Sequence, residues 1–298
     1  MSSLINSRDL IAWCKVPAEE LVGHPQAKVP IRIVATADDV YREFARTMAD
    51  EIRANHAHGL PSRLVIPCGS SWSSHYQYFA RMVNEERISL KKAHIFHMDE
   101  CLDWQGRPLP LDHPLSFQGW MRRHFYDPVD FELGTPEDQR HWPSVYDIDG
   151  ISKAIEAVGV VDTVYGGIGY RGHIAYNEPP NCPWYTVTPE EFRNSKTRIL
   201  HLNDDTIIAL SQRAFGGCSH VVPPMAITMG MKDLLSAKRI RLYSETGAWK
   251  QTIIRILLFG PVTTEFPVTF VQEHPDVLVI VDAKTAACPP LGTLLEGV

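Results

Sequence analysis

The chain has 298 residues, a formal net charge of -6 at pH 7 and 44% hydrophobic residues. That length indicates one or two domains with a substantial core, and the acidic balance argues against a nucleic-acid partner. The sequence contains no run of about 18 apolar residues, so we expect no membrane span. It also lacks a signal-peptide pattern at its start and any C-x-x-C pair among its six cysteines, so we expect a cytoplasmic protein with reduced thiols.

Residues 1–30 read as an amino-terminal extension, with three prolines and only a short helical pattern near Leu10–Cys14. Residues 31–298 read as a single α/β domain. Short apolar and β-branched runs predict strands at Ile31–Ala35, Leu64–Pro67, Ala93–Met98, Val160–Tyr165, Arg239–Tyr243 and Val277–Val281. One helix is predicted between Thr36 and Gly59, and a second from the Gly69-Ser70-Ser71 turn to about Val83. Further helices are predicted at Phe117–Phe125, Ile151–Val158, Thr206–Arg213, Met225–Ser236 and Ala248–Leu258. This alternation predicts a doubly wound, mainly parallel sheet with helices on both faces, as in Rossmann-like folds.

A glycine-rich segment follows the fourth predicted strand and reads V-Y-G-G-I-G-Y-R-G-H-I-A-Y-N-E-P over residues 164–179. Its glycines, Gly167 among them, would let a ligand approach the backbone closely. His173 and Glu178 would then lie at the carboxyl edge of the sheet, where open α/β folds place their ligands. A surface loop with a chance histidine and glutamate is the alternative interpretation.

A second turn of small residues, Gly69-Ser70-Ser71, connects the second strand to a helix. Backbone N–H groups and the positive end of a helix dipole make such a turn a possible phosphate cradle. The spacing matches neither a Walker loop nor G-x-G-x-x-G. A capped helix start without a ligand is the alternative.

Asp99 comes directly after the third strand, at the same edge of the predicted sheet. A carboxylate there can move a proton between adjacent sugar carbons through an enediol, although an N-cap or a surface ion pair would also explain it. Lys250 could add a cation to this edge or be a solvated surface lysine. No histidines and cysteines converge in a metal-binding pattern, so we assign no metal.

Taken together, these segments resemble the glucosamine-6-phosphate deaminase/isomerase family, which is related to the 6-phosphogluconolactonases. The resemblance extends from about Ile31 to about Ala287. It lies in F-H-M-D-E at 96–100, H-P-L-S-F at 113–117, R-H-F-Y-D-P-V-D-F at 123–131, G-G-I-G-Y-R-G-H-I-A-Y-N-E-P at 166–179 and V-P-P-M-A-I-T-M-G at 222–230. The N-E-P ending favours the deaminase branch.

The resemblance implies a role for each matching residue. Asp99 would be the enolising base, His173 would assist opening of the sugar ring, and Glu178 would hold that histidine. The substrate phosphate would be bound by Gly69, Ser70, Ser71 and Lys250, with Arg213 as the nearest arginine. No metal or organic cofactor would be needed, because a carboxylate and an imidazole can carry the proton transfers.

Arg171 departs from the family, which has an acidic residue two positions before the catalytic histidine. An arginine beside His173 would disfavour the imidazolium ion. Arg171 could pair with Glu178, point to solvent, or bind an anionic group of the substrate, and we favour the last because arginine suits carboxylates and phosphates. The phosphate turn departs as well, because it reads C-G-S-S-W instead of T-G-G-T-P.

These observations predict an enzyme that isomerises and deaminates a phosphorylated amino sugar, with the hydrolases as its class and a homo-oligomer as its assembly. The first alternative is an isomerase or lactonase-like enzyme of the same fold that acts on a non-amino or acidic sugar phosphate. The second is a sugar-phosphate sensor without turnover, which ligand-induced stabilisation would reveal.

Overall fold

The computed structural model describes residues 5–180 and 184–290. Its main sheet has seven parallel strands in the order β1-β10-β9-β6-β2-β3-β5. These strands are β1 (Ile31–Val34), β2 (Ser62–Ile66), β3 (Ala93–His97), β5 (Arg140–His141), β6 (Thr163–Gly167), β9 (Arg239–Ser244) and β10 (Val277–Asp282). The doubly wound α/β fold predicted from the sequence is confirmed, although β6 begins three residues later than predicted.

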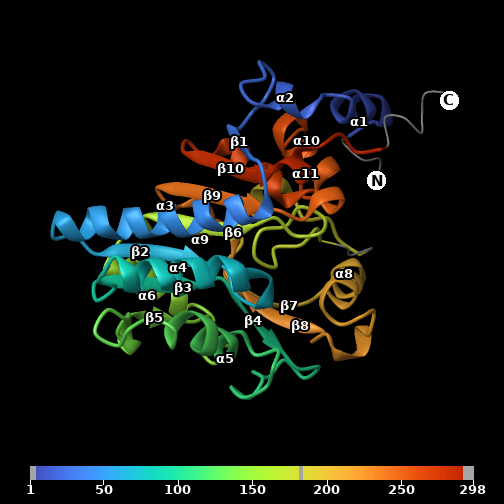
Figure 1. Cartoon of the computed structure of the whole chain (residues 1–298). Coiled ribbons are helices and arrows are strands. Elements are labelled where there is room, and N and C mark those ends of the chain that lie inside the picture. The colour runs from blue at the N-terminus through green and yellow to red at the C-terminus, as the bar shows by residue number, and fades with distance from the viewer. Residues whose placement is uncertain (1–4, 181–183, 291–298) are drawn as a thin grey trace.

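Helices cover both faces of this sheet. They are α1 (Ser7–Cys14), α2 (Ala18–Leu21), α3 (Ala37–Ala57), α4 (Ser73–Glu85), α5 (Phe117–Met121), α6 (Gly150–Val158), α7 (Pro189–Arg193), α8 (Asp204–Ala214), α9 (Met231–Leu235), α10 (Gln251–Phe259) and α11 (Ala283–Ala286). Figure 1 shows α3 and α4 running side by side along the sheet. A π-helical turn, Arg122–Tyr126, continues α5, so the predicted helix at Phe117–Phe125 is present in two forms.

The two faces of the sheet bury alternate residues of the same strands. In β2, Leu64 and Ile66 pack with α3 and α4, whereas Val65 belongs to the core formed with α6, α9 and α10. This period of two is expected for strands that are buried on both sides. The parallel register brings the carboxyl ends of β2, β6 and β9 to one edge.

A second sheet of three antiparallel strands lies at that edge, and the sequence did not predict it. Its order is β4-β8-β7, formed by β4 (Asp99–Leu102), β8 (Met225–Thr228) and β7 (Arg198–His201). The predicted helix at Met225–Ser236 is wrong in its first half, which is β8; only Met231–Leu235 is helical. Figure 1 shows these strands and α8 beyond the arrowhead of β2.

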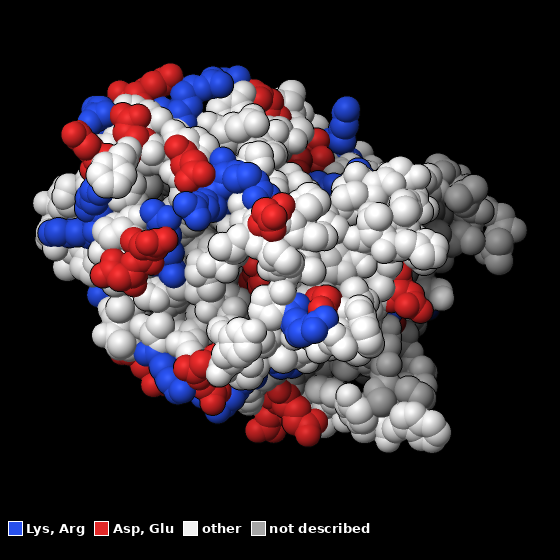
Figure 2. Space-filling view, turned by 90° about the horizontal axis from the view of Figure 1, so that it is seen from below, with Lys and Arg blue, Asp and Glu red and all other residues white. Residues whose placement is uncertain are grey.

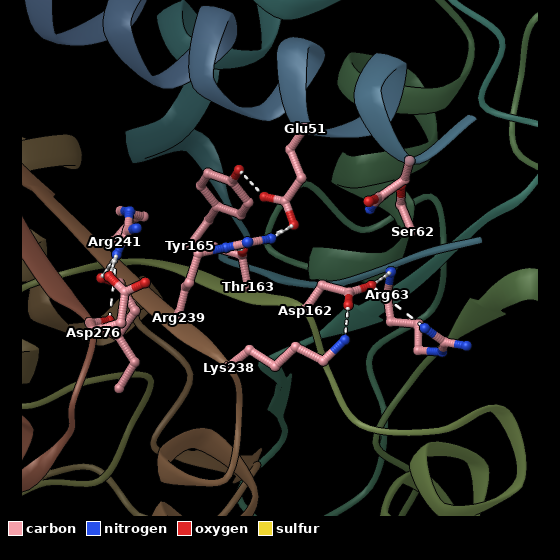
Figure 3. Close-up of polar contacts among 12 residues, drawn as sticks. Glu51, Ser62, Arg63, Asp162, Thr163, Tyr165, Lys238, Arg239, Arg241 and Asp276 are labelled. Carbon is pink, nitrogen blue, oxygen red and sulfur yellow. Dashed lines mark hydrogen bonds and ion pairs between the residues drawn. The ribbon is translucent and has the colours of Figure 1, made fainter. Parts of the chain in front are cut away.

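The opposite, amino edge of the main sheet carries a network of paired charges (Figure 3). Glu51, from α3, accepts hydrogen bonds from Tyr165 Oη at 2.6 Å and Arg239 Nη2 at 2.6 Å. Asp162, just before β6, accepts one from Lys238 Nζ at 2.7 Å and another from the Arg63 backbone N–H at 2.9 Å. This edge is therefore tied together by satisfied polar groups.

The amino-terminal residues pack against the domain. Cys14 of α1 and Leu21 of α2 are fully buried, and Arg255 of α10 donates a hydrogen bond to the Val16 carbonyl at 2.9 Å. The division at residue 30 remains a prediction. No helix of the described residues is long and apolar enough to cross a membrane.

The surface is mixed in charge on the face that Figure 2 presents. Lys and Arg side chains lie among Asp and Glu side chains there, beside a broad uncharged area. A mixed surface gives no extended field of one sign. This face therefore presents no extended positive patch to an anionic ligand.

Candidate active site

A cavity of about 500 Å³ opens at the carboxyl edge of the main sheet. Segments that follow β2, β6 and β9 line it, together with the start of β4 and one side of α8. Its size is typical of a pocket for a small organic ligand. Eight of the ten residues that the sequence predicted for the site line this cavity: Gly69, Ser70, Ser71, Asp99, Gly167, His173, Arg213 and Lys250. The other two, Arg171 and Glu178, lie outside its lining.

The turn after β2 has a conformation that requires glycine. Gly69 has a φ of +91°, and a Cβ atom there would lie 2.9 Å from a ring carbon of Phe117. A short 3₁₀ turn, Ser70–Trp72, then runs directly into α4. The turn thus places small residues and the positive end of a 13-residue helix against the cavity.

Gly167 serves a similar purpose on the neighbouring strand, because a Cβ atom there would lie 2.9 Å from the Trp72 ring. The absence of a side chain lets the end of β6 pack directly against the turn after β2. The two ligand-facing loops of the site are therefore held at close distance by a glycine.

Asp99 begins β4, where it pairs with Thr228 of β8. Its carboxyl is almost fully buried, and burial, followed by the neighbouring charge of Glu100, raises its pKa well above the ordinary value. Glu100 takes the opposite side of the strand and accepts backbone hydrogen bonds from Cys101, Phe117 and Gln118 at 2.7–2.8 Å. The strand therefore leaves only the first of the two acids in the cavity lining.

His173 is fixed by the glycine loop after β6. Gly169 donates its N–H to the His173 carbonyl at 2.7 Å, and a Cβ atom at Gly169 would overlap the imidazole ring. Ala175 has a φ of +53°, a conformation that costs energy for a residue with a side chain and that is often found at functional sites. The loop thus holds His173 in the cavity wall at some conformational cost.

The imidazole of His173 is held in its neutral form. Burial lowers the pKa of His173 to about 3, and the Lys250 ammonium contributes the remaining effect. The sequence predicted this direction but named Arg171 as the cause, and that part is wrong. Because Lys250 is the charge that acts on His173, the histidine and the proposed phosphate end of the cavity are electrostatically linked.

Glu178 lies next to His173 without a hydrogen bond to it. His173 Nδ1 and Glu178 Oε1 are 3.8 Å apart, and neither atom has a hydrogen-bond partner among the residues described. The other oxygen of Glu178 accepts the Asn203 backbone N–H at 2.6 Å. Burial raises the pKa of Glu178 to about 7, so this carboxyl can change its ionisation near neutral pH.

The end of the cavity beside α4 holds two cations and one acid. Lys250 follows β9, and burial and the nearby Arg213 lower its pKa to about 8, whereas Glu245 acts in the opposite direction. Arg213, in the last turn of α8, lies 3.8 Å from Glu245. The sequence therefore predicted both cations of this end but not the carboxyl group of Glu245 beside Arg213.

Glu245 and His75 are two wall residues of the cavity, an acid and a histidine, that sequence reasoning missed. Glu245 directly follows β9, and Asp99 lies two residues after the end of β3, so a position near a strand end was a usable signal for both acids. His75 lies in α4, and no pattern in the sequence distinguishes it from a buried helix residue. Tyr170 and Trp249 also line the cavity, with ring centroids 5.6 Å apart.

Comparison with known proteins identifies the family, although no family model matches the chain. The glucosamine-6-phosphate deaminase of Porphyromonas gingivalis is 31% identical over 236 residues, which is 78% of this chain and 81% of that protein. That of Exiguobacterium sibiricum is 31% identical over 260 residues, which is 86% of this chain and 91% of that protein. The chain belongs to the glucosamine-6-phosphate deaminase family.

Solved structures agree with membership of the glucosamine-6-phosphate deaminase family. A monomeric glucosamine-6-phosphate deaminase matches with a TM-score of 0.72 at 26% identity, covering 86% of this chain and 98% of the other. A 6-phosphogluconolactonase from Trypanosoma cruzi matches with a TM-score of 0.63 at 17% identity, covering 89% and 98%. The second match shows a shared fold alone. The predicted family and its fold are confirmed.

In this member of the deaminase family, Arg171 pairs with Asp205. This partner was not among the three alternatives that the sequence offered for Arg171. The Arg171 Nε lies 3.5 Å from Asp205 Oδ2, at the start of α8, and both side chains are about one-third exposed. Asp205 raises the pKa of Glu178 and Arg171 lowers it, after the larger effects of burial and hydrogen bonding. A neighbouring helix thus supplies an acid that partly offsets the reversed charge at position 171.

Metal binding has no visible site in the part of the chain that the structure describes. Within residues 5–180 and 184–290, no group of three or more His, Cys, Asp or Glu side chains is placed to hold a metal ion.

Proposed function

We propose that this protein isomerises and deaminates glucosamine 6-phosphate, releasing a ketose phosphate and ammonia. The observation that carries the proposal is that one cavity contains a buried carboxyl, Asp99, a neutral imidazole, His173, and a cationic end formed by Lys250 and Arg213. Membership of the deaminase family supports the same reaction.

The ring-opening step would use His173. A neutral imidazole can accept the proton of the anomeric hydroxyl and return it to the ring oxygen, which gives the open aldehyde. Glu178 would orient the imidazole once substrate is bound, because catalytic hydrogen bonds are often long in an empty site. The 3.8 Å separation between these two side chains leaves such a bond to be completed by a small movement.

The proton-transfer step would use Asp99. In its ionised form the carboxylate would remove the proton from C2 and return it to C1, while the C1 oxygen gains a proton and the amino nitrogen loses one, which converts the open 2-amino aldehyde to an imine at C2 with a hydroxyl at C1. Water then replaces the imine nitrogen, and ammonia leaves, so the carbonyl ends at C2. The phosphate would be bound at the other end of the cavity by the Gly69–Ser71 turn, Lys250 and Arg213.

The test is a turnover assay that measures ammonia and ketose separately. We expect equal amounts of both from glucosamine 6-phosphate, at a rate in the ordinary range of about 1–1000 per second. Ketose from glucose 6-phosphate without ammonia would instead identify an isomerase of non-amino sugars. Stabilisation of the fold by sugar phosphates without either product would identify a sensor.

The remaining alternative is an acidic sugar phosphate recognised by Arg171. It is favoured by the partial exposure of Arg171 and its salt bridge with Asp205, which a ligand carboxylate could replace. Arg171→Gln should then reduce turnover of an acidic sugar phosphate and leave glucosamine 6-phosphate unaffected. Equal effects on both would remove Arg171 from the binding residues.

Three further expectations from the sequence are retained as proposals: the hydrolase class, a homo-oligomeric assembly and cytoplasmic localisation. The names of the relatives state deaminase activity and give no support to hydrolase as the class. A homo-oligomer is expected, whereas the solved relative with the TM-score of 0.72 is described as monomeric; light scattering of the purified protein distinguishes the two. Cytoplasmic localisation can be tested by cell fractionation.

A further inference from the structure

A cluster of polar side chains lies at the end of the cavity next to α4. It is formed by the acid Glu245 with Arg213, His75, Lys250 and Tyr41. All five residues line the cavity. Glu245 Oε1 is 3.8 Å from Arg213 Nη2, and Oε2 is 3.9 Å from His75 Nε2. The Glu245 side chain is only 9% exposed, so it is a wall group of the cavity and not a surface acid.

His75 is unusual in this cluster because it is buried without polar partners. Its side chain is 1% exposed, and within the described ranges neither ring nitrogen has a hydrogen-bond partner. The rings of Tyr41 and Trp72 pack against it, with centroids 4.6 and 4.4 Å away. A buried polar group without a partner is uncommon in proteins and calls for an explanation, such as a ligand that completes it.

The charged and titratable groups around Glu245 come from five elements. Arg213 reaches it from α8, His75 from α4, Tyr41 from α3, Lys250 from the turn after β9, and Asp282 from the end of β10. Burial raises the pKa of Glu245, and Arg213 lowers it. Burial lowers the pKa of His75 to about 3, so the imidazole supplies no positive charge at neutral pH.

An ionised Glu245 would oppose the binding of an anion at this end. It offsets one of the two nearby cations and would repel a phosphoryl group a few ångströms away. A protonated Glu245 has the opposite effect, because its O–H can donate a hydrogen bond to an anion oxygen, and Arg213 is then free to turn to the anion.

We propose that a phosphoryl anion binds at this end of the cavity together with one proton, which Glu245 takes up and donates back as a hydrogen bond. The neutral His75 ring supplies a further N–H donor from the α4 side. This inference rests on the proposed function only in placing a phosphoryl group at this end, and it adds a binding residue that selects for protonation.

Sulfate is a suitable probe, because it has the shape of phosphate and does not itself take up a proton near neutral pH. Calorimetry in two buffers of different ionisation enthalpy, at about pH 7, measures the protons taken up on binding. We expect about one proton per sulfate for the wild type, with a Kd that rises by up to about tenfold per pH unit. Glu245→Gln should bind sulfate with little proton uptake, with an affinity nearly independent of pH.

Two controls separate Glu245 from its neighbours. Glu273→Gln removes an exposed carboxyl that pairs with Arg193 and does not line the cavity, so it should behave like the wild type. Lys250 is mostly protonated at pH 7, so its own proton uptake on sulfate binding is small. This small uptake should be the same in the wild type and in Glu245→Gln. His75→Gln should retain proton uptake, since the proton is assigned to the carboxyl.

The outcomes are decisive even if one variant fails to fold. The inference is overturned if the wild type binds sulfate without proton uptake, or if Glu245→Gln keeps the proton uptake of the wild type. If glucosamine 6-phosphate is turned over in either case, the proposed function stands. If the wild type neither binds sulfate nor prefers phosphorylated sugars, the phosphate end is wrong, and the proposed function and this inference fail together.

Discussion

The two edges of the main sheet treat charged side chains in opposite ways. At the amino edge, Glu51 and Asp162 each accept short hydrogen bonds from cations or backbone donors (Figure 3). At the carboxyl edge, His173 and Glu178 are 3.8 Å apart without a bond, and His75 has no polar partner among the described residues. The same strands run through both edges, so the strand arrangement does not explain the difference. We attribute it to ligand binding at the carboxyl edge.

This contrast indicates that the carboxyl edge is less stable than the amino edge. Buried polar groups without partners cost free energy, and the fold tolerates them where a ligand can complete them. Changes at the amino edge should therefore affect unfolding and leave turnover intact, whereas changes to Asp99 or Lys250 at the carboxyl edge should affect turnover or substrate binding.

The largest expected effect comes from Asp99→Asn. The amide keeps the shape and removes the base, so turnover of glucosamine 6-phosphate should fall at least about a hundredfold while substrate binding is retained. Asp162→Asn is the matched change at the amino edge, where it weakens the contact with Lys238 and should leave kcat unchanged. An Asp99→Asn protein with near-normal kcat would show that Asp99 is not the base.

Lys250→Ala should weaken binding of phosphorylated sugars by about 1–3 kcal/mol, the range for a charge-assisted hydrogen bond. Unphosphorylated sugars should bind equally poorly to both proteins. Lys238→Ala removes a half-exposed amino-edge lysine and provides the control. Isothermal titration with each sugar measures the effect, and an equal loss for both kinds of sugar would mean that Lys250 acts structurally.

Glu51→Gln should lower the free energy of unfolding by about 1–3 kcal/mol, because Tyr165 and Arg239 lose their charged acceptor. Turnover should not change. Glu132→Gln is the comparison, since Glu132 is 84% exposed and its ion pair should contribute little. Urea unfolding of the three proteins measures the effect, and a kcat that falls with Glu51→Gln would contradict the separation of the two edges.

The smallest effect is expected from His75→Phe and depends on pH. Burial lowers the pKa of His75 to about 3, so the neutral form stabilises the fold above the unfolded pKa of about 6.5, and this contribution is lost as pH falls toward 3. Phenylalanine cannot take up a proton. Between pH 7 and 5, the variant should therefore lose up to about 2 kcal/mol less stability than the wild type.

Urea unfolding at the two pH values measures this difference, and His220→Phe, at an exposed position, should follow the wild type. Parallel losses in the wild type and His75→Phe would show that His75 is protonated in the folded protein as readily as in the unfolded one.

The sequence by itself predicted six of the seven strands of the main sheet, all but the two-residue β5, and much of the site. Runs such as Leu64–Pro67 and Val277–Val281 are apolar over four or five residues, so they indicate buried parallel strands without knowledge of their partners. Once the strands are parallel, their carboxyl ends must share an edge. That rule is sufficient to bring Gly69, Asp99, His173 and Lys250 to one cavity.

Tertiary structure alone decided the second sheet and the partners of the charges. Met225–Thr228 was predicted as helix because a short apolar run has no distinguishing period; pairing with β4 and β7, which are distant in the sequence, makes it a strand. In the same way, Asp205 meets Arg171 and Glu245 meets Arg213 only because α8 packs over the cavity. Local patterns specify which groups are present, but the electrostatics of a buried site depend on distances between segments that only the folded chain brings together.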